Sequence, residues 1–342
     1  MFVVVGEALV DLVGQRGSRT LVAHPGGSPA NVALGLARLG NQVTLMTRLG
    51  RDALGEMVTA HLKSSGVRVE GGSGVGTSTS LAIATLAAGI ATYDFRIEWD
   101  IGDLEPLPVE TRCLHTGSLA TVLAPGRTSV EDLMRREHQR GRVTISYDPN
   151  VRPALLGTPE RARPGIEGLV ALCDVVKVSD EDLLWLFPDR QDEDVARDWL
   201  GRGPALVVVT RGNRGVYAAT AELEVRRPAT PIDLVDTVGA GDSFTSGLLD
   251  GLRRADLIGG SRREAMAAID EATLVSVVDA AVLVAAITCS RPGADPPTRA
   301  EVDAAEAART PTAAAPLGTA RGISPPATGP ASEVAPKRGR YR

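Results

Sequence analysis

The sequence predicts an α/β fold: a doubly wound, mainly parallel sheet with helices on both faces, and a small second β-sheet. Short β-branched runs at 143–147, 175–178 and 205–210 alternate with stretches of helical pattern, as is typical of parallel sheets. Apolar side chains make up 43% of the 342 residues, enough to bury one large core. A β-rich region before position 100 lacks this alternation and predicts the second sheet.

Local signals predict the first elements. Residues 2–6 are a β-branched run that ends in glycine, which indicates a buried strand. A helix is expected over 29–39, because a proline opens the run and a glycine follows it. The same reasoning predicts a strand at 43–47 and a helix at 53–65.

Two hairpins and five helices complete the predicted domain. Residues 80–87 and 91–97 flank Ala88-Gly89-Ile90, and this pattern predicts a β-hairpin. A second hairpin is expected from strands at 216–219 and 223–226. Helices are expected at 159–172, 180–187, 193–200, 240–252 and 263–288.

The C-terminal segment 309–342 has a different composition. It contains six prolines, many small residues and one acid, Glu333. Such a segment cannot bury enough apolar surface to offset its ordering entropy, so we expect a disordered basic tail after a domain of residues 1–308. The composition leaves open a contact with nucleic acid or an anionic surface, and an inert solvated extension is the simpler expectation.

Composition excludes several classes. The net charge of −5 is too modest for a dedicated nucleic-acid binder. The three cysteines form no CxxC pair, which indicates a reduced, cytoplasmic environment. The four histidines show no ligand spacing, so no structural zinc site is expected. The apolar run 274–289 contains Asp279 and predicts a buried helix rather than a membrane span.

Lysine is scarce. The sequence holds Lys63, Lys177 and Lys337, and none of them follows a glycine-rich loop. The P-loop pattern GxxxxGK[ST] is therefore absent. Any chemistry that needs a lysine has only these three candidates.

The strongest motif is the run 236–244, Asp-Thr-Val-Gly-Ala-Gly-Asp-Ser-Phe, which leads into a helix. Gly239 and Gly241 allow backbone amides to converge, and the helix N-terminus adds positive potential there. Asp242 beside this anion hole suits a base that takes a proton from an attacking hydroxyl, which favours phosphoryl transfer to an alcohol. The motif alone leaves open a simpler interpretation, in which Asp242 only caps the helix.

A second motif is Gly26-Gly27-Ser28-Pro29-Ala30-Asn31. Its two glycines permit close approach of the backbone to a ligand, and Asn31 lies on the first helical turn, where its amide can donate and accept. Taken alone, the run is more simply a tight turn from strand to helix.

Together the two motifs resemble the GGxxxN and D-T-x-G-A-G-D blocks of the ribokinase/fructokinase-type carbohydrate kinases, the PfkB family. The resemblance extends over residues 2–304 and includes the closing segment 293–302. It implies a ribokinase-like fold whose small β-sheet, here from about 14–24 and 77–101, closes as a lid over the sugar. Gly6-Glu7-Ala8-Leu9 and Thr92-Tyr93-Asp94-Phe95-Arg96 look more like fructokinases than ribokinases.

The resemblance implies roles for particular residues. The catalytic set would be Asp242 as base with Gly239, Ala240 and Gly241 as anion hole. The substrate-binding set would be Asp11, Gly27, Asn31, Arg96 and Arg152. Two of these have simpler alternatives, Arg96 as a solvated edge charge and Asp11 as a surface acid at a strand end.

The resemblance also implies a nucleotide and cation site. The ATP-binding set would be Lys177, Ser179, Thr210, Gly212, Gly215 and Gly241. Residues 179–182 read Ser-x-x-Asp where the family has N-x-x-E, so the shorter Asp182 would meet Mg²⁺ through water. Asp236 corresponds to a monovalent-cation site in some members, which adds K⁺ to the expected ATP and Mg²⁺, although Pro297 stands where one of those members has a polar residue.

The expected function is transfer of the γ-phosphoryl of ATP to a primary hydroxyl of a sugar, with fructose as the first choice. The alternatives are a kinase for ribose, 2-keto-3-deoxygluconate or a nucleoside, and a non-catalytic sugar or nucleotide sensor on the same fold. The expected partners are therefore small molecules, without nucleic acid or membrane. The resemblance also implies a homodimer through the lid.

Overall fold

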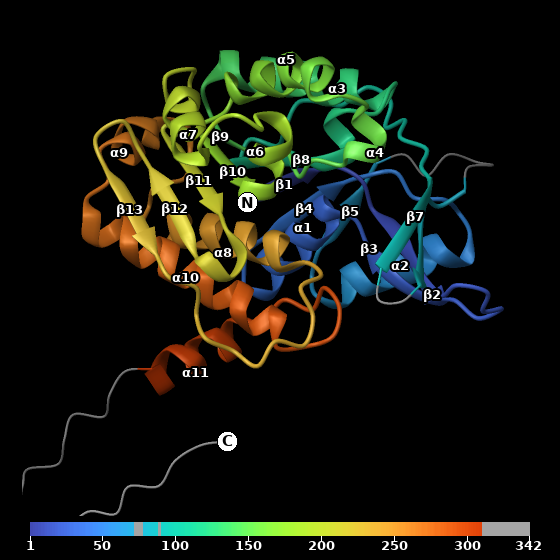
Figure 1. The fold of residues 1–342 in the computed structure, drawn as a ribbon. Coiled ribbons are helices and arrows are strands. Elements are labelled where there is room, and N and C mark those ends of the chain that lie inside the picture. Colours follow the sequence, from blue (N-terminus) through green and yellow to red (C-terminus); the bar gives the residue numbers. More distant parts are fainter. Residues whose placement is uncertain (72–77, 88–89, 310–342) are drawn as a thin grey trace, which may run out of the picture.

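The structure, a computed structural model, describes residues 1–71, 78–87 and 90–309 (Figure 1). Residues 310–342 of the expected tail, residue 77 of the expected lid and the Ala88-Gly89 turn of the first hairpin lie outside these ranges. The described chain forms two sheets, one of nine strands and one of four.

The nine-stranded sheet carries the parallel core that the sequence predicts. Its order is β13-β12-β11-β10-β9-β8-β1-β4-β5, and its pairs are parallel except at one edge, where β12 pairs antiparallel with both β11 and β13. β1 lies between β4 and β8, so the winding direction changes there, and ligands of such sheets bind outside the carboxyl ends of the strands at this point. The strands are β1 Phe2–Val5, β4 Val43–Met46, β5 Arg68–Glu70, β8 Cys113–Gly117, β9 Thr144–Asp148, β10 Val175–Ser179, β11 Leu206–Thr210, β12 Val216–Ala219 and β13 Glu224–Arg227.

Helices cover both faces of this sheet (Figure 1). Alternate residues of β1 divide between two cores: Val4 joins Leu248 of α8, and Val5 joins Trp199 of α7. The first face holds α1 Ser28–Arg38, α2 Ala53–Ser64, α8 Ala240–Arg254, α9 Arg263–Ala267 and α10 Glu271–Cys289. The second holds α3 Gly126–Arg140, α5 Pro159–Val170, α6 Asp180–Leu186 and α7 Asp192–Leu200, with the short α4 Pro153–Leu156 nearby.

The four-stranded sheet has the order β3-β2-β6-β7. Its strands are β2 Leu9–Gln15, β3 Val22–Gly26, β6 Leu81–Ala87 and β7 Ile90–Arg96. The expected hairpin is present as β6 and β7, while β2 and β3 extend well beyond the expected 14–24. Because β2 follows β1 directly and β3 leads into α1, this sheet is attached where β1 ends.

One expected helix is wrong. The run 263–288 divides into α9 and α10, because Asp270 takes an extended conformation between them and caps α10. The Asp270 carboxylate accepts a hydrogen bond from Thr273 N at 2.8 Å. Asp270, an acid within a mostly apolar stretch, therefore marks the start of a new helix and is not an interior helical residue.

By length and composition alone, α10 could cross a membrane. In the fold it packs against α8, and a Cβ added to Gly247 of α8 would lie 2.9 Å from Ala281 Cα of α10. Leu274, Val278 and Ala281 of α10 are among the buried core residues. Its apolar composition is thus accounted for by packing inside the domain, as the sequence predicts.

Candidate active site

Two glycine turns bring the N-termini of α1 and α8 to the switch point of the sheet. Gly239 precedes α8 with a left-handed φ of 73°, and a Cβ there would lie 2.6 Å from Ala294 Cβ. Gly27 precedes α1 with a φ of 102°, and a Cβ there would lie 2.5 Å from Glu7 O. Neither turn could form with a larger residue in place of its glycine.

Asp242 lies in the first turn of α8 and is 8% exposed. Its Oδ1 accepts a hydrogen bond from Ser28 Oγ at 2.7 Å, and its Oδ2 accepts one from Asn31 Nδ2 at 2.8 Å. Burial raises the pKa of the Asp242 carboxyl, while the Asn31 and Ser28 donors lower it. The N-cap of α8 is Gly239 rather than Asp242, so the simpler interpretation as a capping residue does not hold.

The backbone ahead of Asp242 presents helix amides. The first i→i−4 bond of α8 runs from Ser243 N to Gly239 O at 2.8 Å, so the amides of Gly241 and Asp242 precede the helical ladder. The amide of Ala240 is donated to Thr237 O at 3.2 Å. Amides in this position, with the dipole of the helix behind them, suit a developing negative charge.

Lys177 lies on β10 behind this turn. Its ammonium donates to Asp148 Oδ2 at 2.9 Å, and the two side chains are 6% and 1% exposed. A Cβ added to Gly241 would lie 3.0 Å from Lys177 Nζ. Burial opposes the charge of Lys177, but the carboxylates of Asp148, Asp182 and Asp242 together outweigh burial and raise the pKa of Lys177. The residue expected at ATP is therefore a buried cation against the anion-hole turn.

Asp11 lies on β2, in the four-stranded sheet. A Cβ at Gly26 of the neighbouring β3 would lie 2.1 Å from Asp11 Oδ2, so the glycine makes room for the carboxylate. Burial raises the pKa of Asp11 to about 6, while the charges of His24 and Arg152 lower it and that of Asp242 raises it. The expected hydroxyl-binding acid and the expected base thus influence each other electrostatically.

The turn after β9 carries Arg152. Asp148 Oδ1 accepts a hydrogen bond from Asn150 N at 3.1 Å, and the Arg152 guanidinium donates to Asn150 Oδ1 at 2.6 Å. The charge of Arg152 lowers the pKa of both Glu7 and Asp11. Arg152 therefore lies on the same side of the site as Asp11.

Ser179 and Asp182 form a reciprocal cap at the start of α6. Ser179 Oγ accepts a hydrogen bond from Asp182 N at 3.0 Å, and Asp182 Oδ2 accepts one from Ser179 N at 3.4 Å. Asp182 Oδ1 also accepts a bond from Val151 N at 3.0 Å. Burial, helped by the charge of Asp148, raises the pKa of Asp182 to about 6. Asp182 thus ties α6 to the turn that bears Arg152.

Within the described residues, no group of three or more His, Cys, Asp or Glu side chains is arranged to hold a metal ion. The two Asp182 oxygens already accept main-chain amides, which leaves water-mediated contact as their route to a cation. Since Mg²⁺ keeps several waters, this donor set fits an ion that arrives on the ATP phosphates. Asp236 joins the segments expected around a monovalent cation, because it accepts bonds from Val238 N at 3.0 Å and Gly293 N at 2.8 Å.

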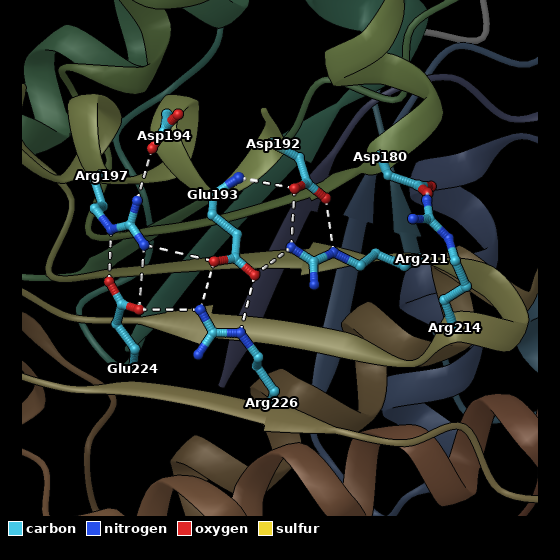
Figure 2. A network of polar contacts seen from close by, with 9 residues as sticks. All are labelled: Asp180, Asp192, Glu193, Asp194, Arg197, Arg211, Arg214, Glu224 and Arg226. Carbon is cyan, nitrogen blue, oxygen red and sulfur yellow. Dashed lines mark hydrogen bonds and ion pairs between the residues drawn. The ribbon is translucent and has the colours of Figure 1, made fainter. Parts of the chain in front are cut away.

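An ion network holds the loop 210–215 (Figure 2). Arg211 donates to Asp192 Oδ2 at 2.7 Å and Oδ1 at 2.9 Å, and its guanidinium lies 5.3 Å from the Tyr217 ring centroid. Arg214 pairs with Asp180 at the start of α6. The rest of the network comprises Glu193, Asp194, Arg197, Glu224 and Arg226. Its ion pairs anchor the loop to α6 and α7.

The remaining expected ATP residues lie along this loop. Thr210 ends β11, and its Oγ1 donates to Val178 O at 3.5 Å. Gly212 and Gly215 have left-handed φ values of 53° and 89°, and a Cβ at Gly215 would lie 2.1 Å from Arg227 O. The two glycines therefore give the loop a path that larger residues would disfavour.

Arg96 lies apart from these residues. It pairs with Asp94 on its own strand at 3.4 Å, and its side chain is 70% exposed. No contact among the described residues joins Arg96 to Asp11 or Asp242. This placement fits the alternative of a solvated edge charge.

Three further residues belong to the site. Ser28, which donates to Asp242, directly follows the two glycines as the first residue of α1 and could have been found by its hydroxyl. Asp148 could have been found as the acid that directly follows the predicted strand 143–147 and stands four residues before Arg152; it neutralises Lys177. Glu7 is buried, its Oε2 accepts a bond from Ala120 N at 3.1 Å, and burial raises its pKa to about 7. No sequence signal separates Glu7 from an ordinary acid at a strand end.

Comparison with known proteins places this geometry among kinases. The family described as pfkB family carbohydrate kinase matches residues 1–301. A fructokinase from Rhizobium leguminosarum bv. trifolii is 33% identical over 283 residues, which cover 80% of this chain and 85% of that protein.

Two solved structures extend the likeness to three dimensions. A fructokinase from Xylella fastidiosa with bound ATP has a TM-score of 0.78 and 25% identity, covering 90% of this chain and 99% of that one. An aminoimidazole riboside kinase from Salmonella enterica, complexed with aminoimidazole riboside and an ATP analogue, has a TM-score of 0.75 and 25% identity, covering 89% and 99%. Both likenesses span almost the whole fold.

Proposed function

The chain belongs to the pfkB family of carbohydrate kinases and is an ATP-dependent sugar kinase, and from this premise we propose that it phosphorylates fructose. The observation that carries the chemical part of the proposal is the buried Asp242 at the N-terminus of α8, held by Ser28 and Asn31. The choice of fructose is supported by the fructokinase that is 33% identical and by residues 6–9 and 92–96, whose sequences resemble those of fructokinases.

In the proposed mechanism, Asp242 takes the proton of a primary hydroxyl as that oxygen attacks the γ-phosphoryl of ATP. Ser28 and Asn31 both donate to the carboxylate, so they hold it ionised and aimed while it waits for the proton. Burial raises its pKa and so makes it a stronger base than an exposed aspartate. The transition state of phosphoryl transfer is loose, so this positioning contributes more than base strength.

The remaining residues hold the two substrates. The Gly241 and Asp242 amides meet the charge that develops on the transferred group. Asp11 accepts hydrogen bonds from acceptor hydroxyls, and Arg152 faces an anionic oxygen of the substrate. Thr210, Gly212, Gly215 and Ser179 line the nucleotide.

We expect Mg²⁺ to enter as part of the nucleotide substrate, where it neutralises phosphate charge. Asp182, tied to the turn that bears Arg152, would meet the water shell of the ion from the α6 side. The Asp236 carboxylate is the residue that would hold K⁺, since a hard cation takes oxygen ligands.

The four-stranded sheet is the proposed lid over the sugar. Asp11 stands on β2, so closing this sheet would carry a hydroxyl-binding acid with it and would exclude water from the phosphoryl group. We propose that residues 1–308 form the kinase domain, that it works in the cytoplasm, and that two copies pair through this sheet.

A riboside is the second candidate acceptor. The aminoimidazole riboside kinase matches this fold with a TM-score of 0.75 against 0.78 for the fructokinase, so fold likeness alone hardly separates the two substrates. A pentose ring also presents a primary hydroxyl and a vicinal diol, the groups that Asp242 and Asp11 would address.

An ADP-release assay over fructose, ribose, 2-keto-3-deoxygluconate, a nucleoside and aminoimidazole riboside tests the proposal. We expect the highest kcat/KM with fructose. A tenfold preference for a riboside would transfer the assignment to the second candidate. Sugar binding by calorimetry without any ADP release would indicate a sensor and would overturn the catalytic proposal.

A further inference from the structure

Lys177 is a buried cation that the proposed mechanism does not use. It is 5% exposed, and its ammonium donates to Asp148 Oδ2 at 2.9 Å. Lysine is rarely buried, because removing its charge from water is costly unless a partner compensates. A partner is present here, so the pair is built into the fold rather than left by chance.

The ammonium lies against the anion-hole turn. A Cβ on Gly241 would lie 3.0 Å from Lys177 Nζ, tighter than nine in ten real Cβ contacts. A glycine at 241 is therefore what allows the ammonium to approach the first turn of α8. The charge of Lys177 adds to the positive potential of the helix N-terminus at the same point.

The partner of Lys177 connects this turn to the acceptor side. Asp148 accepts from Lys177 with Oδ2 and from Asn150 N with Oδ1, and Asn150 Oδ1 in turn accepts from Arg152. A continuous series of bonds thus leads from Lys177, which lies against the α8 turn, to the Arg152 guanidinium that influences Asp11. The ion pair spans the two halves of the site.

Several charged groups face this region from different elements. Lys177 faces Asp148 on β9, Asp182 on α6 and Asp242 on α8. Asp242 faces Lys177 and Asp148, and Asp11 on β2 feels its charge. Lys177 is a cation that acts on Asp242, and it favours the ionised form of that carboxyl.

We propose that Lys177 is a positioning residue: paired with Asp148 behind the anion-hole turn, its ammonium fixes Gly241 and adds positive charge where the phosphoryl group passes, without binding ATP itself. This inference rests on the proposed function. The charge acts on a group that gains negative character near the α8 amides during transfer, so Lys177 affects turnover more than nucleotide affinity. Its burial inside an ion pair leaves the nucleotide to be held by the exposed loops.

The experiment uses the full chain and compares Lys177→Met with the double variant Lys177→Met/Asp148→Asn. The single variant leaves the buried Asp148 carboxylate without its cation, so it loses both stability and activity. The double variant removes both charges, so the unfolding midpoint recovers. We expect its kcat to remain down by about 10-fold or more, with ADP affinity within about threefold of the parent. Lys63→Met, at an exposed position of α2, is the matched control and keeps the parent values.

The pH profile supplies an independent readout. Loss of the Lys177 charge raises the pKa of Asp242, so the acid limb of kcat in Lys177→Met moves to higher pH. A merely structural role would lower the whole profile without moving that limb. Lys177→Gln, which can still donate to Asp148, is the second variant if Lys177→Met does not fold, and it shows the same shift.

Two outcomes overturn the inference. Recovery of kcat together with stability in the double variant would reduce the pair to a structural element. A fall in ADP affinity of about tenfold or more, measured by calorimetry without any acceptor, would make Lys177 a direct nucleotide ligand. If no acceptor is phosphorylated, the proposed function fails separately. In that case, the effect of Lys177 on turnover is measured as the rate at which the parent and the same variants slowly hydrolyse ATP to ADP with water as the acceptor.

Discussion

At the scale of single residues, the site depends on carboxylates that the fold partly removes from water. Asp242 is buried and receives two side-chain donors, whereas Asp11, on β2 of the four-stranded sheet, is partly exposed. The same chemical group therefore has two environments a short distance apart. Such separation of environments is how one site assigns a proton acceptor and a hydroxyl-binding group to two aspartates.

The first prediction concerns the base. Asp242→Asn keeps the shape of the side chain but cannot take a proton, so turnover falls by a factor on the order of 10² or more. The variant removes a buried charge whose pKa is raised, so its unfolding midpoint is at least that of the parent. Steady-state kinetics and thermal unfolding measure both effects.

The control for this variant is Asp303→Asn on the exposed face of α11 Arg299–Arg309. It keeps parental turnover. Turnover of Asp242→Asn within about fivefold of the parent would remove Asp242 from the role of base.

The second prediction concerns pH. The pKa of Asp11 is about 6 in the folded chain, above its ordinary value of 3.8. The folded state therefore binds more protons than the unfolded state between about pH 4 and 6, and the contribution of Asp11 to stability falls as pH rises through this window. Asp11→Asn removes this loss, so it is more stable than the parent above pH 6 by about 1–3 kcal/mol and equal to it near pH 4.

Denaturant unfolding of both proteins across pH 4–8 measures this difference. Asp303→Asn again serves as the control, because it removes a carboxylate from an exposed helix position. A difference in the free energy of unfolding between Asp11→Asn and the parent that stays constant from pH 4 to 8 would contradict a raised pKa of Asp11.

A site residue could be predicted when its role requires particular residues at fixed positions nearby in the sequence. Asp242 and its glycines could be found because the chemistry needs them adjacent to one helix start. Glu7 could not, because its burial results from the packing of residues 118–121 far along the chain. For Lys177 the sequence predicted a position near the nucleotide. It could not predict that the ammonium lies behind the turn at Gly241, in an ion pair with Asp148.

At the scale of elements, α8 occupies the central position. It packs between α1 and α10 and presents Asp242 at its N-terminus. Small residues at the contacts allow this: a Cβ at Gly247 would lie 2.9 Å from Ala281 Cα, and one at Gly35 of α1 would lie 2.4 Å from Ser246 Oγ. The close packing of these helices therefore fixes the height of Asp242, the proposed base, above the sheet.

The third prediction tests this packing. Gly247→Ala adds a methyl where backbone already stands, so it lowers the free energy of unfolding by about 1–3 kcal/mol and lowers kcat by shifting α8. Gly168→Ala in α5 is the matched control, because that position is exposed with no neighbour within 4 Å. There the same change stabilises the helix by about 0.5–1 kcal/mol and leaves kcat unchanged.

Chemical denaturation and steady-state kinetics on both variants decide the matter. Equal stability changes of the same sign in the two helices would show that intrinsic helix propensity dominates, and that α8 does not depend on close packing.

Elements could be predicted where a local pattern and the tertiary context agree. The strands β9, β10 and β11 are short apolar runs and lie where expected, because both of their faces are buried. α3 was missed, since the residues 126–140 are mostly polar and only one narrow side packs on the sheet. The single helix expected at 263–288 was wrong, because the Asp270 cap was hidden in an otherwise continuous apolar pattern.

At the scale of the whole molecule, two cores meet at one sheet, and both sheets connect through β1 and α1. The existence of a second sheet was predictable from the hairpin pattern at 80–97, and the family resemblance supplied a second segment at about 14–24, but the pairing of these strands was not predictable. β2 pairs in parallel with β6, some 70 residues later, so its place depends on a long-range contact that no local signal reveals.

The fourth prediction concerns the domain boundary. α11 closes a small cluster in which Val302 packs with Leu39 and Leu283. A chain that ends at Arg309 keeps this cluster, so its unfolding midpoint stays within about 1 °C of the parent and its kcat/KM within about twofold. A chain that ends at Pro297 loses it and unfolds several degrees lower. Calorimetric scans of the two truncated chains measure the difference.

A large drop in the midpoint of the longer chain would place residues after 309 inside the folded domain and would move the proposed boundary of 308.

The seclusion of Lys177 has a practical consequence for handling the protein. Amine-reactive dyes, biotin esters and coupling resins attack exposed lysines, and this sequence offers only three lysines in all. Lys63 stands exposed on α2, whereas the ammonium of Lys177 is shielded by Asp148 and Gly241. The enzyme can therefore be tagged or immobilised through its amines while the centre that moves the phosphoryl group stays chemically untouched.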